Sequence, residues 1–227
     1  MMRILIVGHG RMGRLVEQHA AEHECEIAGV VTRGQHIDQA PAFDVAIDFS
    51  TADAVLGNVA TLSRLGKNVV IGTTGWQAHE TAVRELAAEH RIGVLASANF
   101  SLGLNAFLFV VEEAARRFAA YDDYGAWIHE AHHIKKKDAP SGTALLLKSG
   151  IVGAGFPREI DVSSARAGAI PGTHTVGFDG PADTVTLTHT VRDRAVFAHG
   201  ALEAAKWLAG KHGWFSMKDV LNNTRRS

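Results

Sequence analysis

The first hundred residues alternate short runs of β-branched and aliphatic residues with longer segments in which apolar residues recur at helical spacing. This alternation is typical of βα units on a parallel sheet, and it constrains the fold more than any other feature of the chain. The expected strands are Ile4–Val7, Glu26–Val31, Val45–Phe49, Asn68–Ile71 and Ile92–Ala96. A capping-box-like start at Ser50 and a terminating Gly66 delimit one intervening helix. We therefore expect an α/β domain with a parallel sheet over residues 1–100.

Beyond Phe100 the pattern changes to a mixture of helices and alternating strands. A long apolar helix over 104–118 precedes an alternating strand from Tyr124 to His133 and a helix from Ser141 to Val152. Further strands are expected at Ile160–Ala165, Thr173–Phe178, Thr184–Val191 and Ala195–Phe197. These elements predict a second, α+β domain over residues 101–200. A helical pattern resumes near Ala201, which predicts a carboxyl-terminal helix over 201–227 that packs back on the first domain.

The chain is nearly neutral, with 23 lysines and arginines against 24 aspartates and glutamates. This balance provides no basic field for nucleic acid or for an anionic membrane, so it favours a small-molecule partner. The single cysteine, Cys25, cannot form an internal disulfide, and the first apolar run, Ile4–Val7, is too short for a signal peptide or a membrane span. We therefore expect a soluble cytoplasmic protein.

A glycine-rich turn, Gly8-His9-Gly10-Arg11-Met12-Gly13, follows the first strand and opens a helix, the context that the dinucleotide fingerprint of a Rossmann domain requires. Gly8 permits the tight turn, Gly10 lets the backbone approach a pyrophosphate, and Gly13 lets the helix pack close to the strand. A unit that binds NAD usually carries an acidic residue about twenty positions further on. Here Thr32-Arg33 stands in that place, and an arginine without the acid suits the 2′-phosphate of NADP. The alternative is an ordinary solvated arginine.

Two further segments of small and hydroxylic residues follow expected strands. Gly72-Thr73-Thr74-Gly75 comes after Ile71, and Ser97-Ala98-Asn99-Phe100 comes after Ala96. Open α/β sheets bind ligands at the carboxyl ends of their parallel strands. These residues leave room for a nicotinamide ribose, although ordinary turns select the same residue types.

Residues 130–144 carry two adjacent histidines, three lysines and a Ser-Gly-Thr helix start in one short segment. Histidine titrates near neutrality, lysine supplies a proton and a positive charge, and a helix amino end offers free N–H groups to an anion. Strand alternation places His132 and His133 on opposite faces, so we expect no metal site here. A solvated lysine run is the alternative, but Pro140 turns the chain directly into the helix start. The segment predicts a carboxylate-binding active-site loop.

These segments make the chain similar to the 4-hydroxy-tetrahydrodipicolinate reductase (dihydrodipicolinate reductase) family. The resemblance spans nearly the whole chain and is carried by Arg11-Met12-Gly13, Asp48-Phe49-Ser50, Gly72–Gly75, Asn99-Phe100-Ser101 and, above all, Glu130–Ala144. It implies reduction of 4-hydroxy-tetrahydrodipicolinate to tetrahydrodipicolinate with NADPH or NADH, in diaminopimelate and lysine biosynthesis. It also implies a dinucleotide-binding domain, a substrate and tetramerisation domain, a cyclic dicarboxylate substrate and a homotetramer.

The resemblance also assigns roles to individual residues. His132 takes the family's proton donor and acceptor position, and Lys136 takes the proton-donor position. The substrate-binding positions fall on His133, Gly142 and Thr143. The cofactor positions fall on Gly8, His9, Gly10, Arg11, Met12, Gly13, Arg33, Gly72, Thr73, Thr74, Ser97, Ala98, Asn99 and Phe100.

The chain departs from the family pattern at Thr32, where an acid is frequent, and at Ala198-His199-Gly200, where members often have an Asn-Gly pair. These departures concern cofactor preference more than reaction type. The rival readings are another amino-acid dehydrogenase of similar architecture and a catalytically silent NADP-sensing protein. The first needs a different substrate loop, and the second has no need of an intact acid-base set. Arg166 and Arg194 receive no role, because surface pairing explains an arginine equally well.

Overall fold

The computed structural model describes residues 1–223 and divides the chain into two compact units. Unit 1 contains Met1–Leu102 together with the chain from Ala195 onward, and unit 2 contains Gly103–Arg194. The boundary between the two units after Leu102 lies close to the expected end of the first domain at residue 100. The return to unit 1 begins a few residues before the expected Ala201.

Unit 1 is built on one six-stranded sheet in which every strand pair is parallel. The spatial order is β10-β5-β4-β3-β1-β2. The strands are β1 Met2–Val7, β2 Cys25–Val31, β3 Val45–Asp48, β4 Asn68–Ile71, β5 Gly93–Ala96 and β10 Gly213–Phe215. The central strands β3 and β4 are buried along their whole length, as expected for strands covered on both faces.

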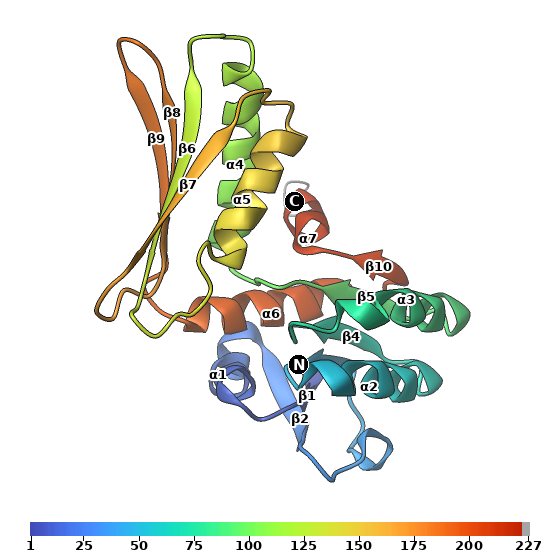
Figure 1. Ribbon diagram of the computed structural model, residues 1–227. Helices are drawn as coiled ribbons and strands as arrows, with labels where there is room; N and C mark the ends of the chain where they lie inside the picture. The colour runs from blue at the N-terminus through green and yellow to red at the C-terminus, as the bar shows by residue number, and fades with distance from the viewer. Residues whose placement is uncertain (224–227) are drawn as a thin grey trace. The chain divides into compact units, whose positions relative to one another are not determined.

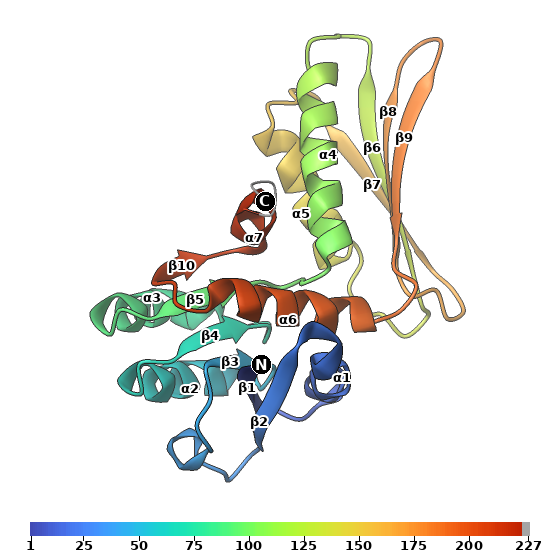
Figure 2. The ribbon, with the colours of Figure 1, turned by 180° about the vertical axis from the view of Figure 1, so that it is seen from behind.

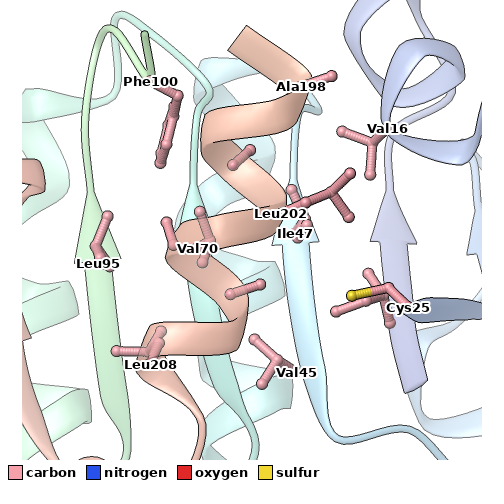
Figure 3. Close-up of a cluster of buried hydrophobic side chains, with 14 of the residues drawn as sticks. Val16, Cys25, Val45, Ile47, Val70, Leu95, Phe100, Ala198, Leu202 and Leu208 are labelled. Atoms are coloured by element: carbon pink, nitrogen blue, oxygen red, sulfur yellow. The ribbon is translucent and has the colours of Figure 1, made fainter. Parts of the chain in front are cut away.

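Helices cover both faces of this sheet (Figures 1 and 2). On one face lie α1 (Arg11–His19) and α6 (Ala195–Leu208); on the other lie α2 (Ala52–Arg64) and α3 (Glu80–Glu89). Short 3₁₀ turns η1 (Ala20–His23), η2 (Ile37–Gln39) and η3 (Gln77–His79) and a last helix α7 (Met217–Asn223) complete the unit. Figure 3 shows Ala198, Leu202 and Leu208 of α6 packed over the side chains of the sheet. The returning carboxyl-terminal segment therefore closes the core of unit 1.

A close backbone contact lies where α6 meets the end of the first segment of unit 1. A Cβ atom on Gly200 would lie 1.7 Å from the carbonyl oxygen of Phe100, so only glycine fits there. Phe100 itself is 2% exposed and belongs to the same core.

Two expectations for the carboxyl-terminal region are wrong. Residues Ala195–Phe197 form the first turn of α6 and not a strand, because their period continues into the buried stripe of Ala198, Ala201 and Leu202. A run of three apolar residues fits either period, and packing on the sheet decides it. The rest of the segment is also not one helix, since Gly213–Phe215 pairs with β5 as an edge strand.

Unit 2 is a four-stranded sheet in the order β7-β6-β8-β9 with helices on one face (Figures 1 and 2). Its elements are α4 Leu102–Phe118, β6 Gly125–His132, α5 Gly142–Gly153, β7 Ile160–Arg166, β8 Thr173–Asp179 and β9 Thr184–Thr190. Only the pairing of β6 with β7 is parallel within this sheet. Both α4 and α5 contribute apolar residues to its core. The described residues contain no helix that is long and apolar enough to cross a membrane.

Candidate active site

The glycine-rich turn has the geometry that a bound dinucleotide requires. Gly8 adopts φ +95°, and a Cβ atom there would lie 2.4 Å from the carbonyl oxygen of Phe49. A Cβ atom on Gly13 would lie 2.1 Å from the carbonyl oxygen of Gly8, so this glycine brings α1 against the turn. A Cβ atom on Gly10 would meet nothing within 4 Å, which leaves open space in front of the helix start. Gly8 and Gly13 therefore shape the turn, and Gly10 exposes its backbone to a ligand.

A cavity of about 440 Å³ opens beside this turn. The expected cofactor residues Gly8, His9, Gly10 and Arg33 line it, together with Thr32 and Gln35. Gln35 was not expected: its side-chain oxygen accepts hydrogen bonds from the backbone and hydroxyl of Thr32, at 2.8 and 2.9 Å. This contact fixes the turn on which Arg33 stands exposed. The cavity lining holds no acidic side chain.

A buried aspartate, Asp48, organises the carboxyl ends of β3 and β4. Its Oδ1 atom accepts hydrogen bonds from the backbone and hydroxyl of Ser50 and, at 2.8 Å, from the hydroxyl of Thr73. Its Oδ2 atom accepts from Asn58 on α2, at 2.8 Å. The sequence marked Asp48 as part of a family motif but did not predict this role. Asp48 positions the expected residues at both strand ends and the wall that Ser50 and Asn58 provide to the cavity.

The segments after β4 and β5 lie at the ligand-binding end of the sheet but do not line the cavity. A Cβ atom on Gly72 would lie 2.1 Å from the Phe49 ring, so this glycine makes room for that ring. Ser97 and Asn99 bond to each other in a compact turn. The Phe100 ring points into the core and meets Phe49 edge-on at 6.1 Å, so any contact between Phe100 and a cofactor must involve its backbone.

In unit 2 the end of β6 carries a buried ion network. Glu130 is completely buried; its Oε1 atom accepts from Arg166 of β7 at 2.6 Å, and its Oε2 atom pairs with His132 Nδ1. Burial raises the Glu130 pKa, but the Arg166 hydrogen bond and nearby charges outweigh it and hold that pKa at about 2. Burial lowers the pKa of His132 in spite of the carboxylate. A neutral His132 beside an ionised Glu130 is therefore the resting state near pH 7.

The network continues to the start of α5. The Glu130 carboxylate also accepts from the Ser141 backbone at 3.3 Å, and the Ser141 hydroxyl is hydrogen-bonded to His174 Nε2 at 3.1 Å. The same hydroxyl caps α5 by accepting from the backbone of Ala144. His174 lies 5.0 Å from His132 between ring centroids, and burial lowers its pKa to about 4. Glu130, Arg166 and His174 were not predicted as site residues.

In the loop between β6 and α5, the Asp138 carboxylate contacts Lys136, the expected proton donor. Lys136 Nζ donates to both oxygens of Asp138, at 2.8 and 2.9 Å. Lys136 lowers the Asp138 pKa most, and the Gly142 backbone at the start of α5 also lowers it. His133 and Thr143 are half-buried beside this loop and Gly142 is exposed. Lys136 and the helix start thus both interact with a carboxylate of the same loop.

The parallel sheet with its glycine turn, and the second sheet with its acid-base loop, define a Rossmann-type NAD(P)H-dependent oxidoreductase. Comparison with family models identifies the family: the model described as "Dihydrodipicolinate reductase, N-terminus" matches residues 2–100, and that described as "Dihydrodipicolinate reductase, C-terminus" matches residues 103–221. The chain belongs to the dihydrodipicolinate reductase family.

Individual relatives agree over nearly the full length. The chain is 34% identical to 4-hydroxy-tetrahydrodipicolinate reductase of Christiangramia forsetii, covering 98% of both chains. It is 38% identical to 4-hydroxy-tetrahydrodipicolinate reductase of Zymomonas mobilis, covering 96% of this chain and 95% of the relative. A dipicolinate-bound dihydrodipicolinate reductase from Paenisporosarcina shares the fold at a TM-score of 0.77 and 23% identity, covering 95% of this chain and 97% of that one.

Proposed function

We propose that the chain catalyses the reduction of 4-hydroxy-tetrahydrodipicolinate to tetrahydrodipicolinate in diaminopimelate and lysine biosynthesis, as a cytoplasmic enzyme. Family matches over both units support this activity. The observation that supports the substrate class is the carboxylate of Asp138. Lys136 donates hydrogen bonds to this carboxylate, and the backbone at the start of α5 lowers its pKa. The rival readings lack comparable support, because the substrate loop and the acid-base set are both present.

The substrate is held, in this proposal, by His133, Gly142 and Thr143. The first turn of α5 contains no acidic residue, so its N–H groups and the helix dipole favour an anion. A substrate carboxylate takes the place of the Asp138 carboxylate at Lys136 and the helix start. The Asp138 side chain is exposed, so its carboxylate can turn away from Lys136 while the Asp138 backbone carbonyl keeps its hydrogen bond from Arg166.

Bound NAD(P)H supplies the hydride. Lys136 donates the proton that the reduced substrate requires, because an ammonium group carries a proton at neutral pH and supplies positive charge where negative charge develops. His132, neutral near pH 7, takes up a proton from solvent and passes it to Lys136, which restores the donor after each turnover. Glu130 fixes the orientation of His132 through its Nδ1 atom.

The cofactor in this proposal is NADPH in preference to NADH. Gly8 to Gly13 hold the pyrophosphate, and Arg33 in the cavity binds the 2′-phosphate with its planar fork. Thr32 presents a hydroxyl instead of a carboxylate and so does not repel that phosphate. Gly72–Thr74 and Ser97–Phe100 hold the nicotinamide end at the carboxyl ends of β4 and β5.

The proposed assembly is a homotetramer formed through the face of the unit 2 sheet opposite α4 and α5. Trp127 lies flat against Gly177 on this face, where a Cβ atom would lie 2.2 Å from the indole. Paired threonine hydroxyls, Thr175 with Thr188 at 3.0 Å, continue the face across β8 and β9. Sedimentation equilibrium of the full chain measures the assembly, and a stable monomer would contradict it.

The proposed activity is tested by mixing purified protein with NADPH and freshly generated 4-hydroxy-tetrahydrodipicolinate and following the loss of nicotinamide absorbance. Pyridine-2,6-dicarboxylate, a flat analogue, should inhibit competitively with substrate. A crystal structure with this analogue should show it against Gly142, Thr143 and His133. Absence of turnover, or an analogue bound to unit 1, would contradict the proposal.

A further inference from the structure

A cluster of three histidines and two glutamates lies in unit 1, where α1 and η1 meet α6. His19 ends α1, Glu22 and His23 belong to η1, and His199 and Glu203 lie one turn apart on α6. None of these residues lines the nucleotide cavity. The three imidazoles are half-buried, so they are screened from bulk water but remain accessible.

The distances within this cluster suit a cation. His19, Glu22 and His199 each offer a ligand atom, and these atoms lie within 4.8 Å of one another. His23 Nε2 lies 2.8 Å from His199 Nδ1, which brings a third imidazole nitrogen next to this group. The His19 and His199 rings are 4.5 Å apart between centroids. Three imidazoles and one carboxylate form a donor set that borderline divalent ions such as Zn²⁺ prefer.

The hydrogen bonds of the cluster indicate where the cation would lie. His23 Nδ1 is bonded to the Glu203 carboxylate at 2.7 Å, which favours a proton on Nδ1 and leaves Nε2 with its lone pair. That lone pair faces His199 Nδ1, so a single proton lies between two ring nitrogens. Two nitrogens on one tetrahedral Zn²⁺ are about 3.3 Å apart. The rings need to separate by only about half an ångström for a metal to replace the proton.

Charge supports the same conclusion. A divalent cation bound to neutral imidazoles is balanced by the two carboxylates, Glu22 and Glu203. Glu203 thereby acts as a positioning residue behind His23, an arrangement common in zinc sites.

We propose that His19, Glu22, His23 and His199 form a binding site for Zn²⁺ or a similar borderline divalent cation. The site joins segments that are 176 residues apart in the sequence, where the chain re-enters unit 1 through α6. A bound metal therefore links α6 to the end of α1, and the free energy of metal binding adds to the stability of unit 1. This role is independent of the reductase activity.

The test uses full-length protein stripped of metal with a chelator and titrated with Co²⁺, whose visible spectrum reports tetrahedral nitrogen and oxygen ligation, followed by Zn²⁺ competition. Wild type should bind a single tight equivalent. His199→Asn and His19→Gln should each weaken binding by at least about tenfold, and Glu203→Gln by roughly tenfold. His212→Asn, which removes an exposed imidazole elsewhere in unit 1, is the matched control and should bind as wild type.

Thermal unfolding provides a second readout that does not depend on the spectrum. Zn²⁺ should raise the Tm of wild type and of His212→Asn but not that of His199→Asn, with circular dichroism confirming that each variant folds. Equal metal affinity in wild type, His199→Asn and His19→Gln would overturn the proposal. So would loss of the metal in His132→Gln, because that result would place the ion in the Glu130, His132 and His174 group of unit 2.

Discussion

The two units prepare a binding site by different means. Unit 1 uses backbone: glycines at Gly8, Gly10 and Gly13 set a turn, and a helix start faces open space. Unit 2 uses buried side chains: Glu130, Arg166 and His174 come from three strands and surround His132. A site made of backbone groups, such as the glycine turn, stores little electrostatic energy in the folded protein. A buried ion network stores more, so we expect unit 2 to be the part of the molecule that is more sensitive to the loss of one charged partner.

The largest expected effect is catalytic and confined to unit 2. Lys136→Ala and His132→Gln should each lower kcat by roughly 10²–10⁴, the usual value of a positioned proton-transfer group, while nucleotide binding is unchanged. Lys135→Ala, an exposed neighbour in the same loop, is the control and should keep near wild-type kcat. Steady-state kinetics and nucleotide titration measure both. If these variants lost nucleotide affinity by the same factor as kcat, the proposed separation of cofactor binding in unit 1 from proton transfer in unit 2 would be wrong.

The next effect concerns the stability of the buried network. Glu130→Gln leaves the Arg166 guanidinium without its carboxylate and should lower the free energy of unfolding by about 3–5 kcal/mol. Glu113→Gln is the matched control, because Glu113 pairs with Arg116 and Arg117 on the exposed side of α4 and such pairs contribute little. Urea unfolding of both variants makes the comparison. Similar small losses would show that the network is no more than a surface pair.

Acid should destabilise unit 2 before unit 1. Burial lowers the His174 pKa from 6.5 to about 4, so the folded state resists a proton that the unfolded chain accepts. The stability associated with neutral His174 is therefore complete above pH 6.5 and declines as the pH falls toward 4, by up to ~3 kcal/mol. The low pKa of Glu130 adds a further loss between pH 4.5 and about 2.

Hydrogen exchange of the unit 2 strands between pH 7 and 4 measures this decline. His174→Asn should flatten it in the upper window, whereas His212→Asn should not. A decline that is unchanged in His174→Asn would assign the acid sensitivity to other groups.

The smallest effect belongs to unit 1. Arg33→Ala should weaken NADPH by roughly ten- to a hundredfold and leave NADH nearly unchanged, because it removes one charge-assisted contact. Arg64→Ala, on the exposed end of α2, should change neither. The Kd values of both nucleotides decide between this role and an Arg33 that points to solvent. Equal losses for both nucleotides would refute binding of the 2′-phosphate.

The same contrast explains what the sequence could predict. The glycine turn, the helix cap at Ser141 and the loop with Lys136 are local signals, and the structure places them as expected. Arg166 and His174 join Glu130 only through the pairing of β7 and β8 with β6, which no local pattern encodes. Asp48 is similar, because its partners come from two other elements. Groups that act through long-range pairing were therefore missed.

The close approach of Gly200 to Phe100 has a consequence for protein engineering. The chain leaves unit 1 shortly after Phe100 and re-enters it at Ala195, so the exit and entry points are neighbours within unit 1. Unit 2 is thus an insertion between two segments of one domain, and the entropy cost of closing the connection depends only weakly on its length. Excising Gly103–Arg194 and joining the ends with a short glycine-serine linker should leave a minimal nucleotide-binding protein, into which other substrate domains could be grafted.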